Sequence, residues 1–128
     1  MPINVIVDIS HHNGNVDLNK AQQAGIAGVI HKGTQGTGMF DRSYTGNRQK
    51  AEAAGLMWGA YHFGTKGDGA AQADFFLSKI NADEQTLLVL DGVAWMHQYV
   101  RSLQCCVPAR LWHESYMPQS TNFSMALT

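Results

Sequence analysis

The chain is short of charge, of basic clusters and of long apolar runs. Only 15% of its 128 residues are charged, the formal net charge is -1, and Lys and Arg do not cluster. Nucleic acids and membrane surfaces both attract basic clusters, so neither partner is expected. No apolar run approaches the roughly 20 residues that a membrane-spanning helix needs. These absences favour one globular domain whose ligand is neutral or of mixed charge.

Export signals and paired cysteines are also missing. Met1 to Asp8 has no basic region and no small-residue cleavage site, and Asp8 itself interrupts the apolar stretch. No signal peptide is therefore visible, and we expect a cytoplasmic location unless another route exports the chain. The only cysteines, Cys105 and Cys106, are adjacent. This spacing suits neither an ordinary disulfide nor a Cys-x-x-Cys metal site, so localisation stays unknown.

Apolar segments alternate with helix signals along the first two thirds of the chain. Asp17, then Asp41 or Ser43, and then Asp68 are each placed to cap a helix. Strand followed by helix, repeated, is typical of a parallel sheet with right-handed crossovers. The four segments that read as buried strands are residues 3–9, 26–31, 56–62 and 86–90.

The composition changes after Gly92. All thirteen glycines lie at or before this residue, and the last thirty-six residues hold only three of the charged side chains. A helical stripe at residues 96–103 predicts one helix, and residues 118–128 show no periodicity. We therefore predict a β/α domain over residues 1–93 and a divergent tail over 94–128, with one helix followed by irregular chain.

Residues able to do acid, base or electrophilic chemistry stand where the expected strands end. They are Asp8, the pair His31 and Lys32, His62, and Asp91. In parallel β/α architectures the carboxyl ends of the strands line the active-site face. Residues far apart in the sequence are thus expected to share one pocket. The glycines near Gly33 match neither the phosphate-loop nor the dinucleotide fingerprint, which argues against a nucleotide cofactor.

Four short motifs, in order, resemble one enzyme family. Residues 8–14, 32–36, 59–63 and 88–91 resemble the successive strand-end motifs of glycoside hydrolase family 25, the lysozymes that cut peptidoglycan. The resemblance covers roughly residues 3–91. It implies a modified β/α barrel that hydrolyses the bond from N-acetylmuramic acid to N-acetylglucosamine, with peptidoglycan glycan strands as the partner and no cofactor or metal.

The resemblance also implies roles for individual residues. Asp8 and Asp91 are implied to be catalytic carboxylates, Asp91 being the first residue of the family's Asp-any-Glu signature. The residues implied to bind the sugar are Tyr61, His62, Lys32 and Gln35, the last standing where the family often has Glu. Lys32 is also placed to pair with Asp8 or Asp91 and to keep them ionised. The alternative to sugar binding is a structural role, with a core histidine at position 62 and a packing tyrosine at position 61.

The chain departs from the family where the signature should end. Residues i and i+2 of a strand face the same side about 6.6 Å apart, so one short motif can present two carboxylates to one sugar bond. Val93 stands where the Glu is expected, and it can neither give nor accept a proton. Nothing after Asp91 resembles the later strands of the family. With 128 residues, against ~200 or more for a closed barrel, we expect an incomplete TIM-like α/β barrel of about four parallel strands.

Three functions follow from these observations. The leading one is a lysozyme-family glycosidase, truncated or frameshifted and catalytically impaired, which leaves open whether it is an active enzyme. The second is a non-catalytic remnant that binds cell-wall glycan. The third is a metal-dependent hydrolase that uses Asp8, His11 or His12, His62 and Asp91. Exposed sheet edges predict self-association in each case.

Overall fold

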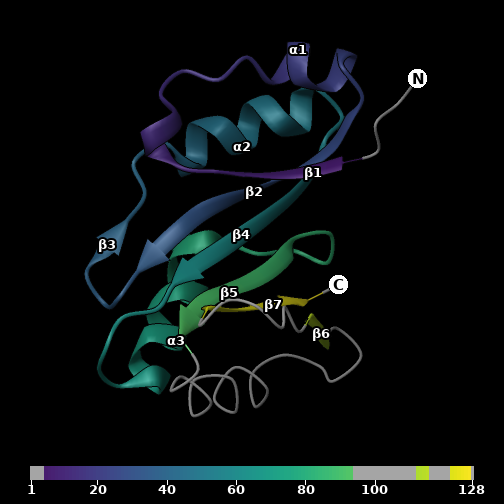
Figure 1. Ribbon diagram of the computed structural model, residues 1–128. Helices are drawn as coiled ribbons and strands as arrows, with labels where there is room; N and C mark the ends of the chain where they lie inside the picture. The colour runs from purple at the N-terminus through teal and green to yellow at the C-terminus, as the bar shows by residue number, and fades with distance from the viewer. Residues whose placement is uncertain (1–4, 94–111, 116–121, 128) are drawn as a thin grey trace.

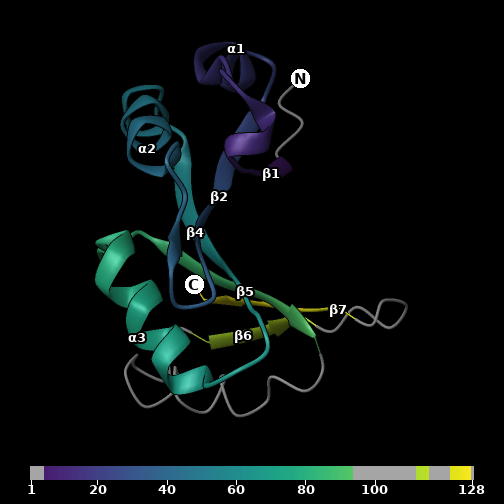
Figure 2. The ribbon, with the colours of Figure 1, turned by 90° about the vertical axis from the view of Figure 1, so that its left-hand side faces the viewer.

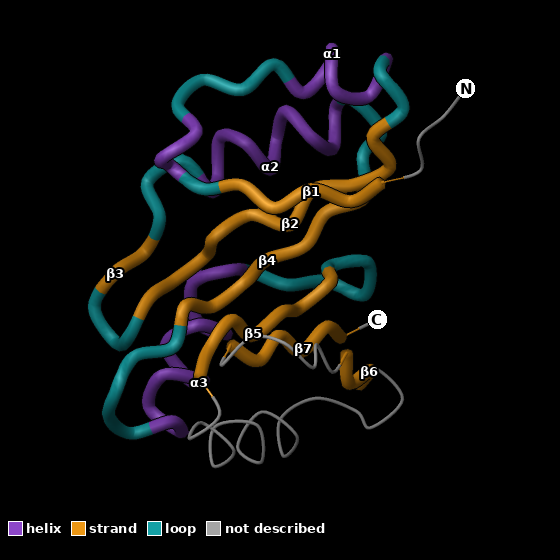
Figure 3. The backbone as a smooth tube through the Cα atoms, viewed as in Figure 1, coloured by secondary structure: helices purple, strands orange, loops and turns teal. Residues whose placement is uncertain are grey.

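The structure, a computed structural model, describes residues 5–93, 112–115 and 122–127. No helix in these ranges is long and apolar enough to cross a membrane. Figures 1 and 3 show how the strands and helices follow one another. In chain order the elements are β1 (Val5–Ile9), the 3-10 helix η1 (His11–Asn13), α1 (Leu18–Gln23), β2 (Ile26–Gln35), β3 (Met39–Phe40), α2 (Tyr44–Ala53), β4 (Met57–Phe63), α3 (Gly69–Ile80), β5 (Leu87–Val93), β6 (Trp112–Ser115) and β7 (Asn122–Leu127).

Four parallel strands form the main part of the sheet. Their order is β1-β2-β4-β5, with every neighbouring pair parallel, as crossover helices require. The short strand β3 folds back as an antiparallel partner of β2. In Figure 1 the four strands fan out from β1 at the top to β5 at the bottom. This curved half-barrel confirms the expected α/β class and the incomplete barrel of four parallel strands.

Two of the three expected side-chain helix caps form where the sequence predicts them. The Asp17 carboxylate accepts a hydrogen bond from the backbone N–H of Lys20 at 3.0 Å, and this fixes the start of α1. Asp68 caps α3 by accepting from the N–H groups of Ala70 and Ala71. For α2 the N-cap is Ser43, whose side chain makes no cap bond.

Two glycines turn the chain from helix into strand. Gly25 and Gly55 follow α1 and α2 with φ angles of 96° and 74°, a left-handed backbone that residues with a Cβ rarely adopt. Each glycine leads directly into a central strand, β2 or β4. The recurrence of Ala-Gly before an apolar segment is therefore a structural repeat of the helix-to-strand turn.

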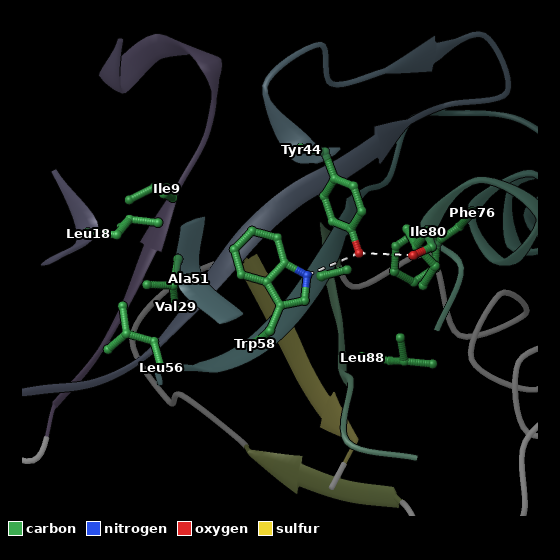
Figure 4. Packing of buried hydrophobic residues seen from close by; sticks show 11 residues of the cluster. Ile9, Leu18, Val29, Tyr44, Ala51, Leu56, Trp58, Phe76, Ile80 and Leu88 are labelled. Atoms are coloured by element: carbon green, nitrogen blue, oxygen red, sulfur yellow. Dashed lines mark hydrogen bonds between the residues drawn. The ribbon is translucent and has the colours of Figure 1, made fainter. Parts of the chain in front are cut away.

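The main core lies between the sheet and the helices α2 and α3. Tyr44 links these elements by hydrogen bonds within the core. Its hydroxyl donates to the Ile80 carbonyl at 3.1 Å and accepts from Trp58 Nε1 at 3.2 Å (Figure 4). The His31 ring stacks on Trp58, and its two nitrogens contact the Lys32 carbonyl oxygen and Asn47 Nδ2. Burial lowers the pKa of His31, so it is a neutral core residue.

Successive residues of each strand face opposite sides of the sheet. Figure 2 shows α2 and α3 on one side of it. Buried side chains such as Trp58 of β4 and Leu88 of β5 point toward these helices. The other, concave side carries Tyr61 and Asp91 together with exposed apolar groups, among them Ile6 and Met57. The barrel interior is thus an open face as far as the described residues go.

The C-terminal part differs from the expectation of irregular chain. Residues 122–127 form β7, which pairs antiparallel with β5, and β6 pairs antiparallel with β7. The backbone groups along the outer side of β5 offer hydrogen bonds to any extended segment, and this explains how a segment without periodicity is recruited as a strand. The expected edge at β5 is therefore covered, whereas β1 is an edge among the described strands. The helix predicted at residues 96–103 lies outside the described residues.

Candidate active site

Two carboxylates and a phenol share a pocket at the carboxyl ends of the parallel strands. Asp8 comes from β1, Tyr61 from β4 and Asp91 from β5. Parallel strands bring their carboxyl ends to one edge, and this is why residues so distant in sequence can meet. The pocket has a volume of about 290 Å³ and is lined by Ile6, Val7, Asp8, Ile30, Tyr61, Val89 and Asp91.

The two carboxylates are in different environments. Asp8 is exposed, whereas Asp91 is half-buried. Burial, and then the negative charge of Asp8, raise the pKa of Asp91, and the nearby Lys32 opposes this shift. Asp91 therefore holds a proton at higher pH than an ordinary aspartate.

Tyr61 lies between these charges. Burial, together with the negative charges of Asp8, Asp91 and Asp41, raises the pKa of Tyr61 to about 12. The hydroxyl group of Ser10, a donor toward the Tyr61 oxygen, opposes this rise of the pKa. The phenol thus remains protonated at neutral pH and is a hydrogen-bond donor beside the pocket.

Lys32 contacts Gln35 rather than the carboxylates. Its ammonium donates to Gln35 Oε1 at 2.5 Å and lies 5.3 Å from the centre of the Phe63 ring. Among the described residues it forms no ion pair with Asp8 or Asp91. The expectation that Lys32 pairs directly with them is therefore wrong: its charge favours ionised Asp91, but burial and Asp8 outweigh it.

The structure does not bring His62 to the pocket. His62 follows Tyr61 on β4, so its ring faces the helices, where it is completely buried against Phe76. Its nitrogens contact Thr34 Oγ1 at 2.7 Å and Gln72 Oε1 at 3.1 Å. Burial lowers the pKa of His62 to about 4. The sugar-binding interpretation of His62 is thus corrected in favour of the core histidine.

A histidine–aspartate pair beside the site was missed by sequence reasoning. Asp41 is completely buried, and its Oδ2 lies 2.7 Å from His11 Nδ1. Burial opposes the ionisation of Asp41, but hydrogen bonds from the His11 ring, the Ser43 N–H and the His11 N–H outweigh it and lower its pKa. This pair anchors the loop after β1, and therefore Ser10, to the turn before α2.

The metal-site alternative loses one of its proposed ligands. Its four proposed positions include His62, which faces the other side of the sheet from Asp8 and Asp91. Within the part of the chain that the structure describes, no three His, Cys, Asp or Glu residues are grouped so as to hold a metal ion.

A larger cavity, of about 680 Å³, lies at the opposite ends of the strands around Met57 and Leu87. Its charged lining includes Arg48, which forms ion pairs with Glu52 and Asp83 and donates to the backbone carbonyls of Ile80 and Asn81 at the end of α3. These contacts join α2 to the loop before β5. We place the functional site at the smaller pocket, because only there do carboxylates converge at the carboxyl ends of parallel strands.

Fold and site together define an α/β protein of the β/α-barrel class with a carboxylate pocket. The family model of glycosyl hydrolases family 25 matches residues 7–100. The chain is 36% identical over 89 residues to lysozyme M1 of Streptomyces globisporus and 37% identical over 76 residues to the N,O-diacetylmuramidase of a Chalaropsis species. These matches cover 68% and 56% of this chain, and 30% and 36% of those proteins.

The fold agrees with the sequence matches. A family GH25 lysozyme from Aspergillus fumigatus aligns with a TM-score of 0.67 at 28% identity, which covers 78% of this chain and 59% of that one. The chain therefore belongs to glycosyl hydrolases family 25. It spans about a third of the length of the curated relatives it matches.

Proposed function

We propose that this chain is a peptidoglycan-directed muramidase domain whose turnover is strongly impaired. Its substrate would be the glycan strand, at the bond from N-acetylmuramic acid to N-acetylglucosamine. The observation that carries the proposal is the convergence of Asp8 and Asp91 on one pocket at the carboxyl ends of β1 and β5. Family membership and the names of the relatives support the choice of substrate.

The pocket contains part of the chemistry that glycoside hydrolysis needs. Such enzymes use two carboxyl groups, one to protonate the leaving oxygen and one to act on the sugar carbon or a water. Asp91 is half-buried and has a raised pKa, whereas Asp8 is exposed. Glycosidases and related enzymes separate acid and base roles by such a difference between the environments of two carboxyl groups. Tyr61 adds a hydrogen-bond donor for a sugar hydroxyl or amide.

Val93 is the reason to expect impairment. It lies two residues after Asp91 on β5, at the position where the family signature implies Glu. Loss of a general acid costs on the order of a hundred- to ten-thousand-fold in rate. This corresponds to about 3–5 kcal/mol of activation free energy, so the remaining carboxylates leave little turnover to detect.

Retention on insoluble peptidoglycan tests the proposed site. We expect the unsubstituted chain to co-sediment with it, and Asp91→Asn to weaken retention because the amide changes the charge and hydrogen bonding of the pocket. Asp74→Asn is the matched control, since Asp74 is an exposed carboxylate of α3 away from the pocket. Equal retention of Asp91→Asn and the unsubstituted chain would place glycan binding elsewhere. Retention without detectable turnover is the result that we expect, and turnover at the rate of a full-length family member would contradict the impairment.

A further inference from the structure

Phe63 is an exposed aromatic residue beside the carboxylate pocket. It is the last residue of β4, and 42% of its surface is exposed, although β4 is otherwise largely buried. Strand alternation places its side chain on the concave face with Tyr61. In the sheet register Phe63 lies opposite Asp91 of β5 and Gln35 of β2. An apolar ring is therefore presented to solvent next to the site's polar groups.

The Phe63 ring has a charged neighbour. Lys32 Nζ lies 5.3 Å from the ring centre, within the range of a cation–π contact. Lys32 is itself only 6% exposed, and its ammonium is fixed by Gln35. This contact favours one orientation of the ring, which lowers the conformational freedom that the ring loses when a ligand covers it.

We propose that Phe63 is a stacking platform for one N-acetylhexosamine ring of the glycan, next to the pocket of Asp8 and Asp91. The proposal rests on the function proposed above and names the residue that contacts the sugar's apolar face. The C–H bonds on one face of a pyranose ring are weakly positive, and they match the negative face of an aromatic ring. The sugar's edge hydroxyls would then face the polar ends of Gln35 and Lys32.

Phe40 supplies a matched comparison. It is another exposed phenylalanine, with 37% of its surface accessible, and it lies on β3. Its ring packs against Tyr44 at 5.6 Å between ring centres, and Phe40 does not line the carboxylate pocket. A loss of glycan affinity caused merely by removing an exposed aromatic side chain would affect both residues equally.

An NMR titration with a soluble peptidoglycan tetrasaccharide tests the proposal. For Phe63→Leu we expect a dissociation constant about three- to tenfold higher, the size of one aromatic contact. For Phe40→Leu we expect a change of less than about twofold. Stacking also moves the sugar C–H resonances upfield, a shift that Phe63→Tyr keeps and Phe63→Leu removes.

The outcomes separate this inference from the proposed function. Unchanged affinity in a folded Phe63→Leu variant, with the upfield shifts still present, overturns the stacking role and leaves the proposed function standing. Absence of binding by the unsubstituted chain overturns both. If Phe63→Leu does not fold, nuclear Overhauser contacts between sugar protons and the Phe63 ring of the unsubstituted chain decide: their presence supports the platform and their absence contradicts it.

Discussion

Asp8 at the end of β1 and Asp91 at the end of β5 line one pocket, and the charge of Asp8 raises the pKa of Asp91. Two parallel strands lie between them in the sheet. Neither carboxylate would acquire this environment in an isolated segment of the chain. Their coupling is thus a property of the assembled half-barrel.

Replacing Asp8 should lower the pKa of Asp91. In Asp8→Asn the negative charge that disfavours ionised Asp91 is gone, while burial and the opposing Lys32 remain. Carbon-13 NMR of the aspartate carboxyl groups, followed against pH, measures this directly. Asp74→Asn is the control and should leave Asp91 unchanged. An Asp91 titration that is the same in Asp8→Asn would contradict the electrostatic contact.

His62 should make the fold sensitive to mild acid. Its pKa is about 4 in the folded chain, against an ordinary value of 6.5, so the unfolded chain binds more protons between these values. The stability that His62 contributes is fully present above pH 6.5 and is lost as the pH falls toward 4, by about 3 kcal/mol.

Urea unfolding at pH 7, 5.5 and 4.5 checks this prediction. The loss of unfolding free energy should be clearly smaller in His62→Gln. It should be unaltered in His12→Gln, because His12 is exposed. The buried His31 leaves some acid sensitivity in every variant, since burial lowers its pKa too. Equal acid loss in His62→Gln and the unsubstituted chain would show that the histidine is not held neutral.

The chain should self-associate through β1. This strand is an edge among the described strands, and Val5 and Ile6 on it are exposed. Unpaired strand edges with apolar side chains pair with other chains. Sedimentation velocity should therefore show an apparent mass that rises with concentration and falls in Val5→Lys. Gln49→Lys, on the exposed face of α2, adds the same charge without touching the edge. A strictly monomeric chain at all concentrations would refute this.

Val93→Glu alone should not give the turnover of a full-length family member. The substitution restores a proton donor at the expected position, but a general acid acts only on a sugar held within hydrogen-bond reach. The described residues supply four parallel strands, half of the eight in a closed barrel. Release of reducing ends from purified peptidoglycan is the measurement. Rates like those of a full-length relative would show that the pocket is complete.

Much of the fold could be predicted because its signals are local. Asp17 and Asp68 precede apolar helical stripes, and a glycine follows each of the first two helices. The pocket residues Asp8 and Asp91 could be found because a carboxylate at the end of an apolar strand is costly to bury, so its presence there indicates a functional role.

Two of the features that the sequence did not predict depend on distant segments that meet. The pairing of His11 with Asp41 joins a loop to a turn, and no local sequence pattern in either segment predicts it. The β7 strand depends on the open side of β5. The misplacement of His62 was avoidable, because adjacent residues on a strand face opposite sides, so His62 and Tyr61 cannot both point into one pocket.

The most direct test measures binding and bond cleavage on the same preparation of purified peptidoglycan. We expect the chain to be retained on it, to lose retention in Asp91→Asn, and to release no reducing ends above buffer where a full-length family member releases them readily. Reproducible release by the unsubstituted chain that disappears in Asp91→Asn would contradict the impaired turnover that we infer from Val93.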